Sequence, residues 1–352
     1  MTWDVALILG IDGLANGAVY LLAGLGLVLI FSVTRVVFVP FGDVAAFAAL
    51  SLAAFETGRR PATIGLVLTL ALIAVLVESW SLWRRGQARR IPRAVLGWGL
   101  LPALPCVAAW AIAGRAGVPA ALQVMVAIAL VVPVTPLVAR IALQPMADAS
   151  VLVLLIASLA LHFLLSGLGL LFFGPEGSRT APLASGSLAL PGGFTVSAQV
   201  LLMIASALVL SGLFFLMFER TVVGKSLRAT AVNRIGARLV GIRPQRTALL
   251  AYTFASLLAG LIGVLIAPVT TMYYDSGFLI GLKAFVAAII GGLVSYPLTA
   301  LGALAVGGVE SFASFWSGAM KDAIVFSLLI PVLLLRSFLV TQHEEEIEEI
   351  DE

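Results

Sequence analysis

Long apolar stretches recur along the whole sequence and decide what this chain can fold into. A transmembrane helix needs about 20 mainly apolar residues to cross the roughly 30 Å hydrocarbon core of a bilayer. Only 11% of the residues are charged, well below the roughly 25% of a soluble domain. We therefore predict an all-α polytopic membrane protein with 10 to 11 transmembrane or re-entrant helices and short loops. The predicted spans lie near residues 13–33, 36–55, 61–83, 94–113, 118–139, 150–173, 196–218, 247–268 and 322–339, with one bent or two short spans in 279–316.

The charges divide the chain into a basic body and an acidic end. The last ten residues hold seven carboxylates, so a formal net charge of +3 becomes +10 for the preceding 342 residues. We treat residues 1–340 as a single transmembrane domain and residues 341–352 as a tail that we expect to be disordered. The basic excess belongs to membrane loops, where anionic lipid is the natural partner, and it requires no nucleic acid.

The loop charges also predict an orientation, because cytoplasmic loops are enriched in Lys and Arg. If the basic segment 219–246 is inside, strict alternation of the spans puts fourteen Lys and Arg on that side, including Arg35, the cluster in 84–93 and Arg140. The other side then holds only Arg59, Arg60, Arg115 and Arg179. This predicts an external N-terminus, and it places the acidic tail inside only if 279–316 crosses twice. Segment 174–197 becomes an external loop with turns, which either connects two spans or contacts an external partner.

Segment 219–246 contains seven of the 21 Lys and Arg and also has helical periodicity. Its apolar residues recur every three to four positions, at Leu227, Ala231, Ile235, Leu239 and Ile242. This pattern predicts one short amphipathic helix that ends at Gly241 and Pro244. From these residues alone, the helix either lies on an anionic membrane surface or docks onto a partner protein.

Residue patterns typical of enzymes are missing from the sequence. His162 lies in an apolar run and His343 begins the tail, and no Cys/His set has metal-ligand spacing. Gly224-Lys225-Ser226 resembles the end of a phosphate-binding loop, but the earlier glycine that such a loop needs is replaced by Glu219. We therefore expect no enzymatic activity, no cofactor and no metal. ATP-driven transport would require a nucleotide-binding partner.

Polar residues inside apolar runs are candidates for a translocation path, because intramembrane charges are costly and usually face protein or water. Asp12, Asn16 and Tyr20 are spaced by four and share one helical face. They form either an interfacial cap with interhelical hydrogen bonds or a path lining. Asp43, at the start of the second span, either caps a helix or lines the path.

Four further charges lie in or beside the last spans: Lys283, Glu310, Lys321 and Asp322. An unpaired charge at such a position would be costly. We expect some of them to form structural salt bridges, with a role in the path as the alternative.

Short motifs add a family resemblance. They are GLANGAVY (13–20), VTRV (33–36), GD (42–43), FGPEG (173–177), GKSLRATA (224–231), ARLVGI (237–242), GFLIGLKAF (277–285), GG (291–292) and KDAI (321–324). Together they resemble the LivH-type permeases of branched-chain amino-acid ABC importers, over roughly residues 12–54 and 140–336. Three stretches depart from the family pattern: the aromatic Phe38–Phe41, the uncharged Val232-Asn233, and 56–118, where we expect an extra helix pair.

The resemblance implies a permease subunit in a bacterial inner membrane that carries branched-chain amino acids or related small solutes. It implies ATPase subunits that bind the ATP, a second related permease and a periplasmic substrate-binding protein as partners. Segment 219–246 would be the coupling segment, and the expected coupling residues are Arg228, Ala231, Asn233, Arg234, Ala237, Arg238 and Gly241. The expected path residues are Asn16, Tyr20, Asp43 and Lys283.

Two alternatives stay open at this point. A self-contained ion-coupled secondary transporter would place acidic residues at broken helices near the midplane, and Asp43 and Glu310 keep it possible. A membrane-embedded enzyme would need a chemical turnover that depends on His162.

Overall fold

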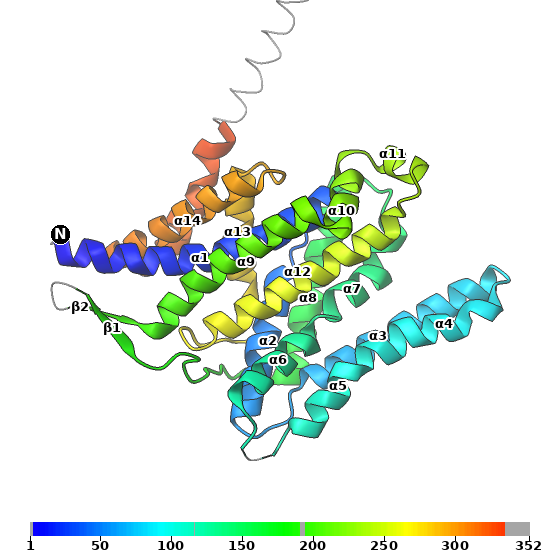
Figure 1. The fold of residues 1–352 in the computed structure, drawn as a ribbon, viewed down its shortest axis with the longest axis horizontal. Coiled ribbons are helices and arrows are strands. Elements are labelled where there is room, and N and C mark those ends of the chain that lie inside the picture. Colours follow the sequence, from blue (N-terminus) through cyan, green and yellow to red (C-terminus); the bar gives the residue numbers. More distant parts are fainter. Residues whose placement is uncertain (1–2, 116, 191–193, 335–352) are drawn as a thin grey trace, which may run out of the picture.

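The computed structural model describes residues 3–115, 117–190 and 194–334, and it consists almost entirely of helices (Figure 1). Residues 335–352, with the predicted acidic tail and the end of the last predicted span, lie outside the described residues. The longer elements are α1 (Trp3–Thr34), α2 (Phe41–Glu56), α3 (Thr63–Arg84), α5 (Leu101–Ile112), α6 (Ala120–Val131), α8 (Val151–Phe173), α9 (Ala198–Arg220), α12 (Pro244–Ile266), α13 (Gly277–Ile290) and α14 (Tyr296–Trp316). The shorter ones are α4 (Ile91–Val95), α7 (Val134–Val138), α10 (Val222–Val232), α11 (Arg234–Leu239), α15 (Lys321–Ser327), β1 (Ser187–Leu190) and β2 (Phe194–Ser197).

Eight helical segments of the described chain are long and apolar enough to cross a membrane. Two of them are composite, Ala88–Ile112 through α4 and α5, and Ala120–Met146 through α6 and α7. The prediction of an all-α polytopic membrane protein is confirmed. The region 279–316 contains two helices, α13 and α14, because the chain turns sharply at Gly292 and Leu293, which have φ of 69° and 61°.

Helix α2 is almost completely enclosed, since 14 of its 16 residues are buried. It packs on α12, α13 and α6. Small residues make this packing possible, because they let helix backbones approach closely. A Cβ atom at Gly42 would overlap the carbonyl group of Gly277 in α13, and one at Gly263 in α12 would overlap the carbonyl of Ala45. The backbones of α2 and α13 therefore touch where the two helices cross.

Glycines also allow the long α1 to pack closely along α14. A Cβ at Gly307 of α14 would overlap the backbone of Gly13 and Gly17, which have GxxxG spacing on α1. Close approach of this kind gains van der Waals contact, which is the main attraction between helices in lipid. Helices α1, α2, α12, α13 and α14 thus form the closely packed body of the molecule.

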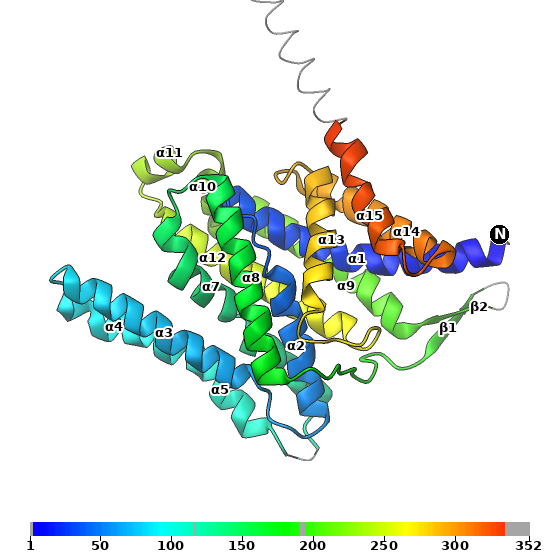
Figure 2. The ribbon, with the colours of Figure 1, turned by 180° about the vertical axis from the view of Figure 1, so that it is seen from behind.

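Within the predicted extension 56–118, α3 and the composite helix 88–112 form a helical hairpin that projects from one side of this body (cyan in Figure 1 and Figure 2). Helix α3 runs beside the composite helix 88–112, which is interrupted by a π-helical turn at Leu96–Leu100. The hairpin contacts α6 and α7. Arg140, on the composite helix 120–146, pairs with Glu78 of α3 and stacks over Trp98 at 5.6 Å. We expected Arg140 in a loop, whereas it lies inside a span, where Glu78 compensates its charge.

The spans alternate in direction, so the basic loops gather at one end. We call this the basic end; it consists of the turns near Arg35 and Gly86 together with α10 and α11 (Figure 1). The opposite end holds the start of α1 and the antiparallel hairpin β1–β2, which the sequence analysis did not foresee within the 174–197 loop. Arg179 of that loop donates a 2.8 Å hydrogen bond to the Pro268 carbonyl, and Ser178 exchanges backbone hydrogen bonds with Met272. The 174–197 loop is therefore tied to the 266–277 turn.

Candidate functional site

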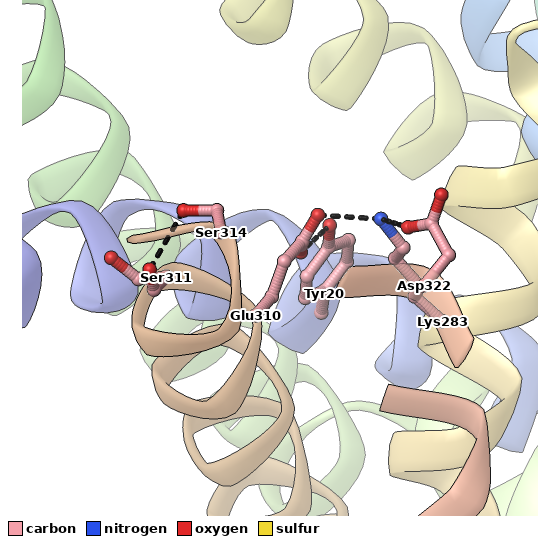
Figure 3. Close-up of polar contacts among 6 residues, drawn as sticks. All are labelled: Tyr20, Lys283, Glu310, Ser311, Ser314 and Asp322. Atoms are coloured by element: carbon pink, nitrogen blue, oxygen red, sulfur yellow. Dashed lines mark hydrogen bonds and ion pairs between the residues drawn. The ribbon is translucent and has the colours of Figure 1, made fainter. Parts of the chain in front are cut away.

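Four side chains from four helices form an ionic cluster within the bundle (Figure 3). The ammonium of Lys283, on α13, lies 2.5 Å from Glu310 Oε1 on α14 and 2.8 Å from Asp322 Oδ1 on α15. The hydroxyl of Tyr20, on α1, donates to the other carboxylate oxygen of Glu310. The side chains of Lys283 and Glu310 are 7% and 8% exposed, while that of Asp322 is 34% exposed.

The cluster sets one cation between two carboxylates. Burying a charge is tolerable when it is paired and hydrogen-bonded, and both conditions hold for Glu310. The partly exposed Asp322 can retain part of its hydration. The expectation that some charges of the last spans pair is met by Lys283, whereas Lys321 forms no ion pair among the described residues. The cluster therefore ties α1, α13, α14 and α15 together electrostatically.

Two serines continue this polar region along α14 (Figure 3). Ser311 donates a 2.7 Å hydrogen bond to the Leu9 carbonyl of α1, and Ser314 donates one of 2.7 Å to the Ser311 carbonyl. Asn16 lies one turn from Tyr20 on α1 and is partly exposed. Of the predicted path residues, the structure thus brings Tyr20 into direct contact with the Lys283 cluster and leaves Asn16 beside it.

Asp43, the remaining predicted path residue, belongs to a second buried polar pair. Its Oδ2 lies 2.7 Å from Nδ1 of His162 on α8, and the two side chains are 0% and 6% exposed. The other carboxylate oxygen has no hydrogen-bond partner among the described residues. Asp43 therefore caps no helix, and α2 begins after Pro40 without a side-chain cap. The imidazole stacks on Phe278 of α13, with ring centroids 4.5 Å apart.

This pair joins three helices where α2 begins. Ser158, one turn before His162 on α8, accepts a 2.9 Å hydrogen bond from the backbone N–H of Val39. Helix α8 is therefore bound to the 39–43 turn at two successive positions on one face. The pairing of His162 is a feature that sequence reasoning missed. A lone histidine in an apolar run was a signal, because a buried imidazole needs a polar partner.

The coupling segment consists of two helices, not the single amphipathic helix predicted from its periodicity. Asn233 interrupts the helix with extended backbone angles, φ −149° and ψ 106°. Its side chain accepts hydrogen bonds of 3.0 and 2.9 Å from the N–H groups of Ile235 and Gly236, which starts α11. Thr221 caps α10 in the same way, by accepting from Gly224. The apolar repeat that continues across Asn233 therefore does not form one buried stripe.

Only part of the apolar repeat faces the bundle. Leu227 is fully buried and Thr230 bonds to Thr247 of α12 at 3.1 Å, so α10 is anchored. The apolar residues around α11 are 72–84% exposed: Val232, Ile235, Leu239 and Val240. We call these four residues, with the exposed Arg228 and Arg238, the coupling surface.

The predicted coupling residues occupy different environments in this segment. Asn233 and Gly241 are exposed, Ala231 and Arg234 are partly buried, and Ala237 is buried. Arg234 borders a cavity of about 380 Å³ between α11 and the end of α1, and its Nε has no hydrogen-bond partner among the described residues. The segment thus offers an exposed surface that is both apolar and basic, and this surface is held in place by the anchored helix α10.

Comparison with known proteins assigns the chain to a family. Residues 10–334 match the family model described as "Branched-chain amino acid transport system / permease component". The chain belongs to this permease family. The resemblance to LivH-type permeases, predicted from short motifs, is therefore confirmed.

Individual relatives agree with the family. The permease is 36% identical over 140 residues to the high-affinity branched-chain amino acid transport system permease protein BraD of Pseudomonas aeruginosa, covering 39% of this chain and 45% of the relative. It is 30% identical over 209 residues to the LivH proteins of Salmonella typhimurium and Escherichia coli, covering 56% of this chain and 66% of each relative. The alignments thus span about half to two thirds of the length of these relatives. No solved structure matches the permease significantly.

Proposed function

We propose that this permease is the membrane subunit of an ATP-driven ABC importer for branched-chain amino acids or related small solutes. It would act in a bacterial inner membrane with ATPase subunits, a second related permease and a periplasmic binding protein. The permease would bind no ATP or other cofactor itself. The family membership and the names of the relatives support this role.

The observation that best supports coupling to an ATPase is the coupling surface. Its apolar side chains are too exposed to contribute to the fold, and exposed apolar patches of this kind mark contact sites. Arg238, which forms no ion pair among the described residues, would complement an acidic groove and fix the orientation of docking, whereas Arg228 is paired with Glu219 at 2.7 Å. The caps at Thr221 and Asn233 hold α10 and α11 in place, so a force on the coupling surface would reach α9 and α12 directly.

For the path, we propose the region between α1, α2 and α13, where Asn16, Tyr20, Asp43 and Lys283 lie. Three of these side chains are engaged in buried pairs in this conformation. ATP binding would bias the helices between two packings. Exchange of these pairs for contacts with solute or water would accompany the change.

The coupling proposal is tested by reversing charge at Arg238 of the coupling surface and at Arg234, which directly precedes its Ile235, in Arg234→Glu/Arg238→Glu. We expect weaker copurification with the ATPase subunits and a matching loss of uptake, because the charge complementarity is inverted. The control, Arg59→Glu/Arg60→Glu, changes two exposed arginines at the opposite end. Unchanged association and uptake in the first variant would refute the proposed role.

An ion-coupled secondary transporter is the second candidate, and the buried Asp43–His162 pair is the observation that favours it. Such a pair can carry a proton within a membrane. The two candidates are separated by uptake into proteoliposomes that contain the permease alone. Uptake driven by a proton or sodium gradient without an ATPase would favour the second candidate, whereas dependence on the ATPase subunits and ATP would favour the first.

A further inference from the structure

The projecting hairpin leaves an apolar groove of about 440 Å³ between itself and the body of the permease. One wall is the helix 88–112, where Gly97, Leu101 and Pro105 are spaced by four residues and so share one face. The opposite wall is formed by Val132, before α7, and by Leu249 of α12. The groove has open space at Gly97, since a Cβ there would meet no atom within 4 Å. It is lined almost entirely by carbon and lies within the membrane-spanning part of these helices.

Tryptophans fix the depth of the groove in the bilayer. Trp80 and Trp83 are 57% and 63% exposed near the tip of the hairpin, with ring centroids 5.5 Å apart. At the other end of the hairpin, Trp110 is 59% exposed and lies 5.0 Å from the guanidinium of Arg60. Exposed Trp side chains concentrate at the headgroup level of both leaflets. The groove, which runs from Gly97 to Pro105, therefore lies between these two levels and below the headgroups at the basic end.

Five exposed arginines surround the tip at this same level: Arg84, Arg85, Arg89, Arg90 and Arg93. None of them forms an ion pair within the described parts of the chain. The sequence contains no Asp or Glu from residue 79 to residue 147, and Glu78, the acid just before this stretch, pairs with Arg140. A cluster of this density at a membrane surface attracts anionic phosphate groups. Arginine also binds phosphate oxygens in pairs through its planar guanidinium.

Arg93 and one wall of the groove lie on the same helix. Arg93 precedes Gly97 by four residues on the helix 88–112, and the spacing of four continues through Leu101 to Pro105. An α-helix rises 1.5 Å per residue, and the π-helical turn at Leu96–Leu100 is wound more compactly, so these twelve steps span at most about 18 Å. One leaflet has about half of the roughly 30 Å hydrocarbon thickness. An acyl chain that starts from a phosphate at Arg93 would thus fill the groove over the depth of one leaflet.

We propose that the groove and the arginines Arg89, Arg90 and Arg93 bind one anionic phospholipid of the leaflet at the basic end. Its phosphate contacts the arginines, and one acyl chain lies along Gly97, Leu101 and Pro105. The lipid fills the space between the hairpin and α12, where the two share few contacts. A protein helix would fill the groove equally well, but it would leave five arginines without counter-charge. The charge therefore favours the lipid.

The test uses the full chain in phosphatidylcholine nanodiscs with a trace of phosphatidylglycerol that carries a photoactivatable diazirine in its acyl chain. Labelled peptides are mapped by mass spectrometry. We expect concentrated labelling of residues 97–105 and 129–137. In Arg89→Gln/Arg90→Gln/Arg93→Gln this labelling should fall at least about tenfold, because each surface cation contributes a factor of about five to the binding of anionic lipid.

Three controls separate the parts of this proposal. Arg59→Gln/Arg60→Gln/Arg115→Gln removes three exposed arginines at the opposite end and should leave the labelling unchanged. Leu101→Trp narrows the groove and should reduce the labelling with the arginines intact. A phosphatidylcholine probe with the same diazirine should label the groove weakly.

Equal labelling by the two probes would overturn the proposal, since the arginines would then select no charge. Labelling spread evenly over the lipid-facing helices would overturn it as well. So would a disulfide or photo-cross-link from position 98, in the variant Trp98→Cys, to a second permease chain in the assembled complex, since a protein would then occupy the groove.

Discussion

Replacing Lys283 by methionine tests whether the ionic cluster holds α13, α14 and α15 together. Methionine has a similar length and no charge, so Glu310 keeps its hydrogen bond from Tyr20 and loses its ion pair. At an effective dielectric constant of 20, the contacts of 2.5 and 2.8 Å correspond to gross attractions of about 7 and 6 kcal/mol. Most of this attraction offsets the desolvation of the buried ions. Removal of one partner of such a pair lowers the free energy of unfolding by about 3–5 kcal/mol.

A second substitution in the same background isolates the cause. In Lys283→Met/Glu310→Gln, the glutamine can still accept from Tyr20, and no uncompensated carboxylate remains at the 8% exposed position. Asp322 is left alone, but its side chain is 34% exposed and can be hydrated. We therefore expect the double variant to be more stable than Lys283→Met by roughly 2 kcal/mol, since replacing a whole buried pair costs less than breaking it.

The assay is thermal unfolding of the purified permease in detergent, followed by tryptophan fluorescence. The expected loss corresponds to a fall in Tm on the order of 10 °C for Lys283→Met. Lys321→Met is the matched control, because Lys321 is the residue before Asp322 and has no ion pair in the described structure. The reasoning is refuted if Lys283→Met unfolds at the same Tm as the wild type. It is also refuted if adding Glu310→Gln to Lys283→Met does not raise the Tm.

Three other substitutions follow from the packing and the caps. Asn233→Ala removes both hydrogen bonds that start α11 and should cost about 1 kcal/mol locally, seen as faster amide exchange in 234–239 with the global Tm preserved; unchanged exchange would contradict the cap. Gly42→Ala forces α2 and α13 apart and should sharply reduce the yield of folded protein, while Gly308→Ala, which meets no atom within 4 Å, should be tolerated; equal yields would show that the crossing is loose. His162→Phe leaves the carboxylate of Asp43 buried without a donor and should lower Tm more than Asp43→Asn/His162→Phe; the reverse order would show that the pair is not an important interaction.

The spans could be predicted from the sequence because each helix in a bilayer satisfies its own backbone hydrogen bonds. Hydrophobicity and length alone then locate it. The division of 279–316 was also visible, in the Tyr296-Pro297 pair that starts α14. The break at Asn233 was a local signal as well, because asparagine is a preferred cap. It was hidden by an apolar repeat that continues in register across it.

The polar pairs could be predicted only in part. A charge inside a span requires a partner, which made pairing among the last charges predictable. Which carboxylates meet Lys283 depends on how α13, α14 and α15 pack. Asp43 and His162 are 119 positions apart, and no local pattern relates them. Only the three-dimensional fold brings them within hydrogen-bond distance.

The crossing of α2 and α13 limits how the permease can move. At Gly42 and Gly277 the two backbones touch with no side chain between them, so there is no flexible layer that could absorb a sliding motion. Because packed interfaces switch between discrete arrangements and do not deform continuously, we expect an opening beside Asp43 to occur as a rotation about this contact. The crossing would then act as a fulcrum, and a small tilt applied at the basic end would be converted into an opposite tilt on the other side of the membrane.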